Sequence, residues 1–148
     1  QQAIRLYPSL GLFEGTVVSV GRVTDAPFQV LGLPSEQQDL SDLKSYQFTP
    51  SSRAGAQYPP YLDQLCLGLD LRTELAPPFT LRYLLYFQQR YSGQKPFFNP
   101  FFDKLAGTDQ LRKQLEQGWS EIAIRRSWQE GLEGYLILRK KYLLYPES

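Results

Sequence analysis

A proline-rich segment in the middle of the chain sets the strongest limit on its fold. The segment PSSRAGAQYPPY, residues 50–61, has three prolines and several small residues within twelve positions. Proline fixes φ and has no backbone N–H, so this segment is expected to form neither a helix nor a central strand. Loops of this length inside a compact domain are uncommon and tend to be functional. We therefore expect a loop, with different periodicities on its two sides.

The sequence before and just after this loop has the pattern of β-strands. Val and Phe are frequent in the early runs, and leucine occupies every second position of LCLGLDL, as in a strand with one leucine face. Gly32–Pro34 is expected to break the second run, and residues 35–46 are expected to form a loop or a single helical turn. The expected strands are residues 12–20, 28–31, 46–49 and 65–71.

The second half of the chain predicts helices. Apolar residues have helical spacing over 79–91, after two prolines. Thr108 is a suitable N-cap for a helix over 109–117, which Gly118 ends. Ser120 opens a short helix, and a last helix runs from about Trp128 to Lys141. Strands followed by helices indicate an α+β fold, with helices packed on the sheet. The buried face expected for the last helix is Leu132, Tyr135, Leu136 and Leu138.

The segment QKPFFNPFFDKLAG contains four phenylalanines, at positions 97, 98, 101 and 102, and fits no single period. One interpretation is a loop whose rings close the end of the core. The other is an aromatic surface that another domain covers, because a free domain rarely exposes so much apolar area. Trp119 and Trp128, on helical segments, are expected in the core.

The composition excludes several kinds of site. The chain has no histidine, so it has no imidazole base or metal ligand, and its single cysteine leaves no internal disulfide or thiolate cluster. Cys66 has no evident cationic neighbour and is expected to be buried and structural. We expect no metal and no cofactor. Any chemistry would depend on carboxylates, Tyr, Lys or Arg.

Charge and hydropathy limit the partners. The net charge of +1 gives no basic field for nucleic acid. No apolar run approaches the roughly 18 residues of a membrane span, and residues 1–5 do not resemble the apolar region of a signal peptide. The length of 148 residues indicates one domain. Because the sequence starts without Met, we interpret it as a mature form or an excised fragment.

Four segments, in order, resemble one family. They are LFEGT..SVGR.TD.PF from residue 12, GAQYPPYLDQLCLGLDL from residue 55, PFF..FFDKLAGTD from residue 96, and a closing KYLLY. Over residues 6–145 the chain resembles the C-terminal domain of the NamZ-type exo-β-N-acetylmuramidases, long classed as a domain of unknown function, and it is similar to members from Bacteroidota. The resemblance implies a two-domain glycosidase that removes N-acetylmuramic acid from the non-reducing end of peptidoglycan fragments.

The same resemblance implies that a Rossmann-like N-terminal domain supplies the catalytic Glu. That domain is absent from residues 1–148, so we assign no catalytic residue to this chain and expect no activity from it alone. The family's active site lies in the cleft between the two domains, and its substrate implies an exported or periplasmic location. The expected partners are thus the N-terminal catalytic domain and a peptidoglycan-derived amino sugar.

The expected substrate-binding residues follow from the chemistry of this sugar. Its lactyl carboxylate needs a cation, which Arg22 supplies, unless Arg22 merely pairs with Asp25 at the surface. Glu14 is expected to accept a hydrogen bond from a sugar hydroxyl, or else to face solvent. Tyrosine can stack on a sugar ring. The full expected set is Glu14, Thr16, Arg22, Asp25, Arg53 and Tyr58.

Two positions depart from the family pattern. Val23 stands where glycine is usual, which would remove a position with positive φ. Leu33 stands where histidine is frequent, which would remove a polar group from a loop near the cleft. We interpret the chain as the accessory domain of such a glycosidase. The alternatives are a stand-alone carbohydrate-binding or protein-interaction module and, third, a self-contained enzyme.

Overall fold

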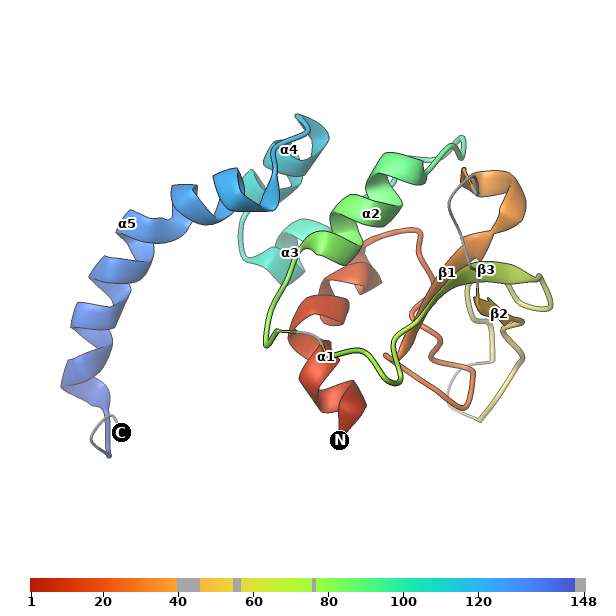
Figure 1. Cartoon of the computed structure of the whole chain (residues 1–148), viewed down its shortest axis with the longest axis horizontal. Coiled ribbons are helices and arrows are strands. Elements are labelled where there is room, and N and C mark those ends of the chain that lie inside the picture. Colours follow the sequence, from red (N-terminus) through yellow and green to blue (C-terminus); the bar gives the residue numbers. More distant parts are fainter. Residues whose placement is uncertain (40–45, 55–56, 76, 146–148) are drawn as a thin grey trace.

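The computed structural model describes residues 1–39, 46–54, 57–75 and 77–145. Within these residues a three-stranded antiparallel sheet lies beside a group of helices, and a long last helix extends away from both (Figure 1). The predicted α+β class is confirmed. The helices are α1 (Gln2–Leu10), α2 (Arg82–Arg90), α3 (Phe102–Ala106), α4 (Gln110–Glu116) and α5 (Glu121–Arg139). The strands are β1 (Val30–Pro34), β2 (Tyr46–Phe48) and β3 (Cys66–Asp70), and the 3₁₀ helices are η1 (Gly11–Gly15), η2 (Ser35–Gln37) and η3 (Lys140–Tyr142).

The sheet confirms the period of two in LCLGLDL. Its order is β1-β3-β2, and Leu31 lies opposite Leu69 across the β1–β3 pair. Leu31 is fully buried in the main core, against which Leu69 also packs. Cys66 lies on the other face, in a smaller cluster with Val30 and Phe48. Burial raises the pKa of the Cys66 thiol to about 12, so the predicted structural cysteine is confirmed.

The main core lies between the leucine face of the sheet and the helices. Phe13 of η1 meets Phe87 of α2 edge to face, with 6.0 Å between ring centroids. Phe102 of α3 packs its ring 4.5 Å from that of Phe98. The remaining core side chains come mainly from α1, the extended segment after η1, β1, α2, α4 and the start of α5. None of the described helices is both long and apolar enough to cross a bilayer.

The strand predicted at residues 12–20 is wrong in its first part. Residues 2–10 form α1, which the sequence analysis did not predict, and the chain continues directly into η1. Residues 16–20 are extended but make only isolated bridges, Thr16 with Phe98 and Ser19 with Gly32. Burial of Phe13 against α2 stabilises the helical turn more than β propensity stabilises a strand here.

The other strand boundaries agree in part. β2 matches the predicted strand at 46–49, but β1 starts at Val30 and includes the expected breaker Gly32–Pro34. Pro34 is tolerated because it is the last residue of an edge strand. η2 falls in 35–46, of which residues 40–45 lie outside the described part. No helix or named strand lies in the described residues of 50–61, as predicted, and residues 55 and 56 are not described.

In the second half of the chain, the helices predicted over 79–91 and 109–117 are confirmed as α2 and α4. The last two predicted helices form one continuous helix, α5. Ser120 caps α5, because its Oγ accepts a hydrogen bond from the Ala123 N–H at 3.3 Å. From there α5 runs without a break to Arg139, since no proline interrupts it. The predicted buried face of its second half is wrong for this chain, because the four side chains are 47–59% exposed.

The aromatic loop supports the first of its two interpretations. Phe97, Phe98 and Phe102 are buried in the main core, and Phe101 alone of the four is 47% exposed. Trp119 is also exposed, contrary to expectation. Trp128 is half-buried, with its ring 6.2 Å from that of Phe79.

Candidate functional site

The segment that follows η1 forms a tight, hydrogen-bonded turn. Gly21 has φ +65°, and the space that its Cβ would need is filled by Val30, so glycine is required at this position. Thr24 Oγ1 donates to the Gly21 carbonyl at 2.8 Å and accepts from the Ala26 N–H at 3.1 Å. The Phe28 N–H then donates to the Val20 carbonyl at 2.9 Å. The turn thus holds residues 21–28 against the start of β1.

A cavity of about 250 Å³ lies beside this turn. It includes three of the six predicted binding residues, Glu14, Thr16 and Arg22. Their polar groups lie beside an apolar wall to which the proline-rich loop contributes. The other lining residues are Phe13, Val18, Ser19, Val20, Val23, Pro59 and Pro60.

Arg22 and Glu14 form the charged part of this cavity. Arg22 Nη2 donates to Glu14 Oε1 at 2.6 Å, a charge-assisted hydrogen bond. The guanidinium also lies over the ring of Phe28, 5.1 Å from its centroid. Of the five N–H donors of a guanidinium, the Glu14 contact uses one. Glu14 therefore orients Arg22 and leaves donors that an anion can use.

Phe28 adopts an unusual backbone conformation beneath Arg22. Its φ is +56°, a region that bulky residues rarely occupy and that costs about 1–3 kcal/mol. Its ring packs 4.9 Å from that of Tyr7 in α1. Backbone strain of this kind persists where the surroundings hold it, often at functional sites.

Thr16 lines the cavity and also stabilises the backbone. Its Oγ1 donates to the Phe13 carbonyl at 2.8 Å and accepts from the Val18 N–H at 3.1 Å. These bonds fix the change from helical to extended backbone after η1. Its hydroxyl is thus already engaged in the free protein.

The other three predicted residues lie outside the lining of this cavity. Asp25 pairs with Arg53, whose Nη1 donates to Asp25 Oδ1 at 2.9 Å. The suggested surface pair of Arg22 with Asp25 is therefore wrong, because each residue has a different partner. Tyr58 is 89% exposed, which suits contact with a partner but does not define a site.

A larger cavity, of about 410 Å³, was missed by the sequence analysis. It lies where the proline-rich loop meets the residues that follow α2, and Val17 and Tyr61 form part of its wall. The signal that could have indicated it is the SGQK turn directly after α2. Its other lining residues are Glu36, Gln37, Tyr91, Ser92, Gly93, Gln94 and Lys95.

Tyr61 lines the larger cavity and directly follows Pro60, which lines the smaller one. Its φ is +60°, and its hydroxyl lies 2.8 Å from the Val17 carbonyl and 3.2 Å from Gln37 Oε1, so it donates to one of them at a time. Burial, followed by the nearby Tyr91, raises the pKa of Tyr61 to about 12. The phenol is therefore protonated at neutral pH and holds the loop to the extended segment. We take the smaller cavity as the candidate site because three of the six predicted residues line it.

The structure corrects one of the two expectations about departures from the family pattern. Val23 is buried and its φ is not positive, which leaves the expectation for that position as a prediction; the left-handed glycine of this turn is Gly21, two residues earlier. Leu33 is fully buried in β1 and not in a loop. In the described part of the chain, no group of three or more acidic or cysteine side chains is placed to hold a metal ion.

Comparisons with known proteins agree with one another. A family model described as "Exo-beta-N-acetylmuramidase NamZ, C-terminal" matches residues 5–145. The peptidoglycan β-N-acetylmuramidase NamZ of Bacillus subtilis (strain 168) is 31% identical over 152 residues, which cover 95% of this chain and 37% of that protein. The crystal structure of a DUF1343 family protein from Bacteroides fragilis NCTC 9343 superposes with a TM-score of 0.85 at 42% identity, covering 99% of this chain and 41% of that one. The chain thus spans about two fifths of the length of these relatives.

Proposed function

This chain belongs to the family of C-terminal domains of the exo-β-N-acetylmuramidase NamZ, and we propose that it forms one wall of a cleft that binds N-acetylmuramic acid. In this proposal an N-terminal domain supplies the other wall and the catalytic Glu. The substrate is the non-reducing end of a peptidoglycan fragment, and the enzyme acts outside the cytoplasm, where such fragments arise.

The pairing of Arg22 with Glu14 at the cavity carries the proposal. N-acetylmuramic acid differs from N-acetylglucosamine by a lactyl ether that ends in a carboxylate. A guanidinium recognises a carboxylate through two parallel hydrogen bonds. Arg22 is held at the cavity by Glu14 at 2.6 Å and by the Phe28 ring, so its remaining donors are already oriented for such an anion.

The size and lining of the cavity also support one wall of a larger cleft. Ligand pockets usually measure about 300–1,000 Å³, whereas this cavity holds about 250 Å³. Pro59 and Pro60 on its side present apolar surface, which suits the C–H face of a sugar ring. A second wall would complete the enclosure of the sugar.

The proposal is tested by Arg22→Ala in the complete gene product that contains residues 1–148. A charge-assisted contact in a partly dry cleft contributes about 1.5–3 kcal/mol. The variant should therefore lower kcat/KM for an N-acetylmuramic acid glycoside by roughly 10- to 150-fold. The loss should be much smaller for the matching N-acetylglucosamine glycoside, which has no lactyl carboxylate.

Arg72→Ala is the matched control. Arg72 pairs with Asp70 at 2.6 Å and lies 5.0 Å from the centroid of the Tyr46 ring, the same arrangement as at Arg22, but it does not line the cavity. It should leave the preference between the two sugars unchanged. Equal losses for both sugars in Arg22→Ala, together with a lower Tm, would instead assign Arg22 a structural role.

A further inference from the structure

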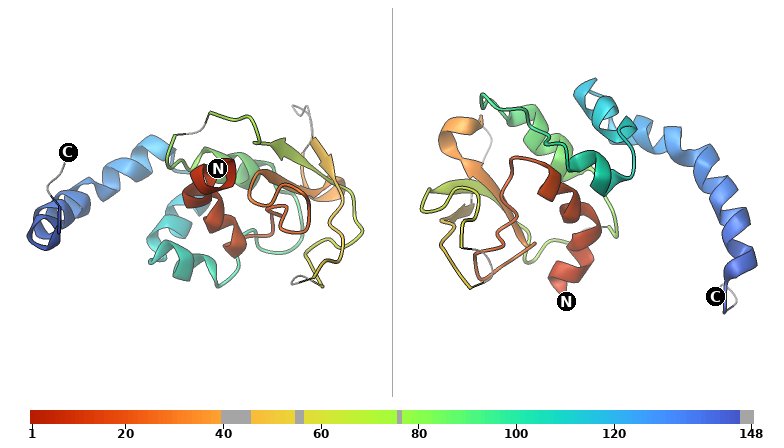
Figure 2. Two further views of the ribbon diagram at one scale, coloured as in Figure 1. Left: turned by 90° about the horizontal axis from the view of Figure 1, so that it is seen from below. Right: turned by 180° about the vertical axis from the view of Figure 1, so that it is seen from behind.

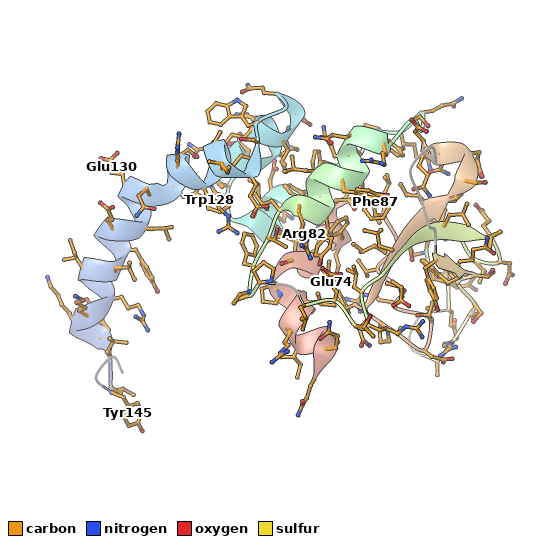
Figure 3. All side chains as sticks on the ribbon, in the orientation of Figure 1. Glu74, Arg82, Phe87, Trp128, Glu130 and Tyr145 are labelled. Atoms are coloured by element: carbon orange, nitrogen blue, oxygen red, sulfur yellow. The ribbon has the colours of Figure 1, made fainter. Side chains whose placement is uncertain are left out.

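The first half of α5 is fastened to the body of the protein. Thr80 Oγ1 donates to Glu121 at 3.0 Å, and Arg125 Nη2 donates to the Phe79 carbonyl at 2.7 Å. Ile124 is fully buried in the main core. After Trp128 the helix extends away from the body toward Tyr145 (Figure 3).

The apolar side of this helix continues beyond the body without cover. Spacings of three and four residues place the apolar residues of the second half on the side of Ile124 and Trp128. Five of these apolar side chains are 47–76% exposed, and we call them the α5 stripe. The stripe consists of Leu132, Tyr135, Leu136, Leu138 and Tyr142.

The opposite side of the helix is mainly polar. It carries Glu130, Glu133, Lys140 and Lys141, so the second half of α5 is amphipathic. An apolar stripe of this width normally faces a core, and helices in proteins owe most of their stability to packing of that side. A contiguous group of large exposed apolar side chains marks an interaction surface.

The relatives indicate what covers the stripe. The match to the B. fragilis structure takes in 99% of this chain, and hence α5, at a TM-score of 0.85. The match thus aligns α5 with a part of a protein most of whose chain lies outside the match. Because the family is named for the C-terminal part of NamZ, that remainder precedes the matched part.

The placement of α1 and α5 agrees with such a partner. The start of α1 and the far end of α5 lie at the same, lower side of the molecule in Figure 1 and in the view from behind in Figure 2. On that side α1 has a second exposed apolar patch, a shallow groove lined by Ala3, Ile4, Tyr7 and Pro8. A domain joined to residue 1 would meet α1 first and lie on the side toward which α5 extends.

We propose that the α5 stripe is a docking surface for the N-terminal domain of a NamZ-type protein. Only the identity of this partner rests on the proposed function. The test compares the complete gene product with the 148-residue chain by hydrogen exchange. Backbone amides of residues 131–142 should exchange on the order of tenfold more slowly in the complete product, because a docked helix opens less often.

Two neighbouring substitutions provide a matched pair. Leu136→Glu places a charge in the stripe, whereas Ile137→Glu places the same charge on the opposite side, where Ile137 is 69% exposed. In the complete product Leu136→Glu should abolish the slow exchange and Ile137→Glu should preserve it. Because both sites are exposed, both variants should keep the fold of the rest of the domain.

Three outcomes would overturn the docking proposal. The first is equal exchange of residues 131–142 in the two proteins, and the second is a gene product with no domain before residue 1. The third is protection that rises with concentration in the 148-residue chain alone, which would indicate a second copy of the chain. Hydrolysis is measured on the same samples: slow exchange without hydrolysis of N-acetylmuramic acid glycosides would preserve the docking surface and refute the proposed function.

Discussion

Replacement of Gly15 by alanine should destabilise the protein through a clash between two backbones. A Cβ at this position would lie 2.4 Å from Phe102 Cα and 2.7 Å from Phe102 N. Backbone atoms cannot rotate away, so α3 would have to move from η1. Phe102 is fully buried, and such a movement would loosen its packing against Phe98. Overpacking of this kind costs about 1–3 kcal/mol, and we expect the upper end of that range.

Gly11→Ala is the matched control, four residues earlier in the same 3₁₀ helix. Its Cβ would meet only the Tyr7 ring, at an ordinary 3.6 Å, and its backbone is helical, with φ −58°. Alanine there should stabilise the protein by about 0.5–1 kcal/mol, because the unfolded chain loses freedom.

Urea denaturation followed by fluorescence measures both changes. At this chain length each kcal/mol shifts Tm by about 2–4 °C, so thermal scans should separate the two variants clearly and with opposite signs. If Gly15→Ala unfolded at the same urea concentration as the unmodified chain, the close approach of η1 and α3 would be refuted.

Two further predictions follow from the pKa shifts. Burial raises the pKa of Cys66 to about 12, so a thiol reagent at about pH 8 should label the chain only after urea unfolds it; fast labelling of the folded protein would contradict this burial. Burial also tends to raise the pKa of Glu121, but hydrogen bonds from Arg125, the Leu81 backbone and Thr80 outweigh it, and the net shift is downward. A lowered folded-state pKa gives stabilisation that is complete above the unfolded pKa and is lost as the pH falls through the folded pKa. Glu121→Gln should therefore reduce the loss of Tm between about pH 7 and pH 3, and an unchanged acid limb would argue against these bonds.

Local sequence patterns predicted those elements whose signal depends only on neighbouring residues. The alternation in LCLGLDL predicted β3 and its leucine face because strand side chains have a period of two regardless of the partner strand. Thr108, Gly118 and Ser120 predicted helix ends to within a residue or two, since capping depends on a few neighbouring backbone groups. Helix α1 was missed because its sequence contains Pro8 and only a few buried apolar residues.

The candidate site was predictable in residue type but not in pairing. The motif around residue 12 led to Glu14, Thr16 and Arg22, which the structure places at one cavity. The ion pairs were not predictable. Arg22 pairs with Glu14 in η1 and not with the nearby Asp25, and Asp25 pairs with Arg53 in the distant proline-rich loop. Both pairings depend on the turn at Gly21 and on how the proline-rich loop folds back, which no local spacing encodes.

The error in the burial of α5 is informative for a different reason. The second half of α5 has the apolar spacing of a buried helix, and its exposed apolar residues lie on the side that is buried earlier in the same helix.

Tyr7 connects the apolar patch of α1 to the cavity. It lines the apolar patch of α1 and packs its ring 4.9 Å from Phe28, which lies beneath Arg22. A domain that docked on α1 and α5 would therefore contact Tyr7, which supports the ring under the cation at the cavity. Tyr7, Phe28 and Arg22 thus connect the apolar patch of α1 with the cavity, and a domain that covered this patch would lie near the cavity.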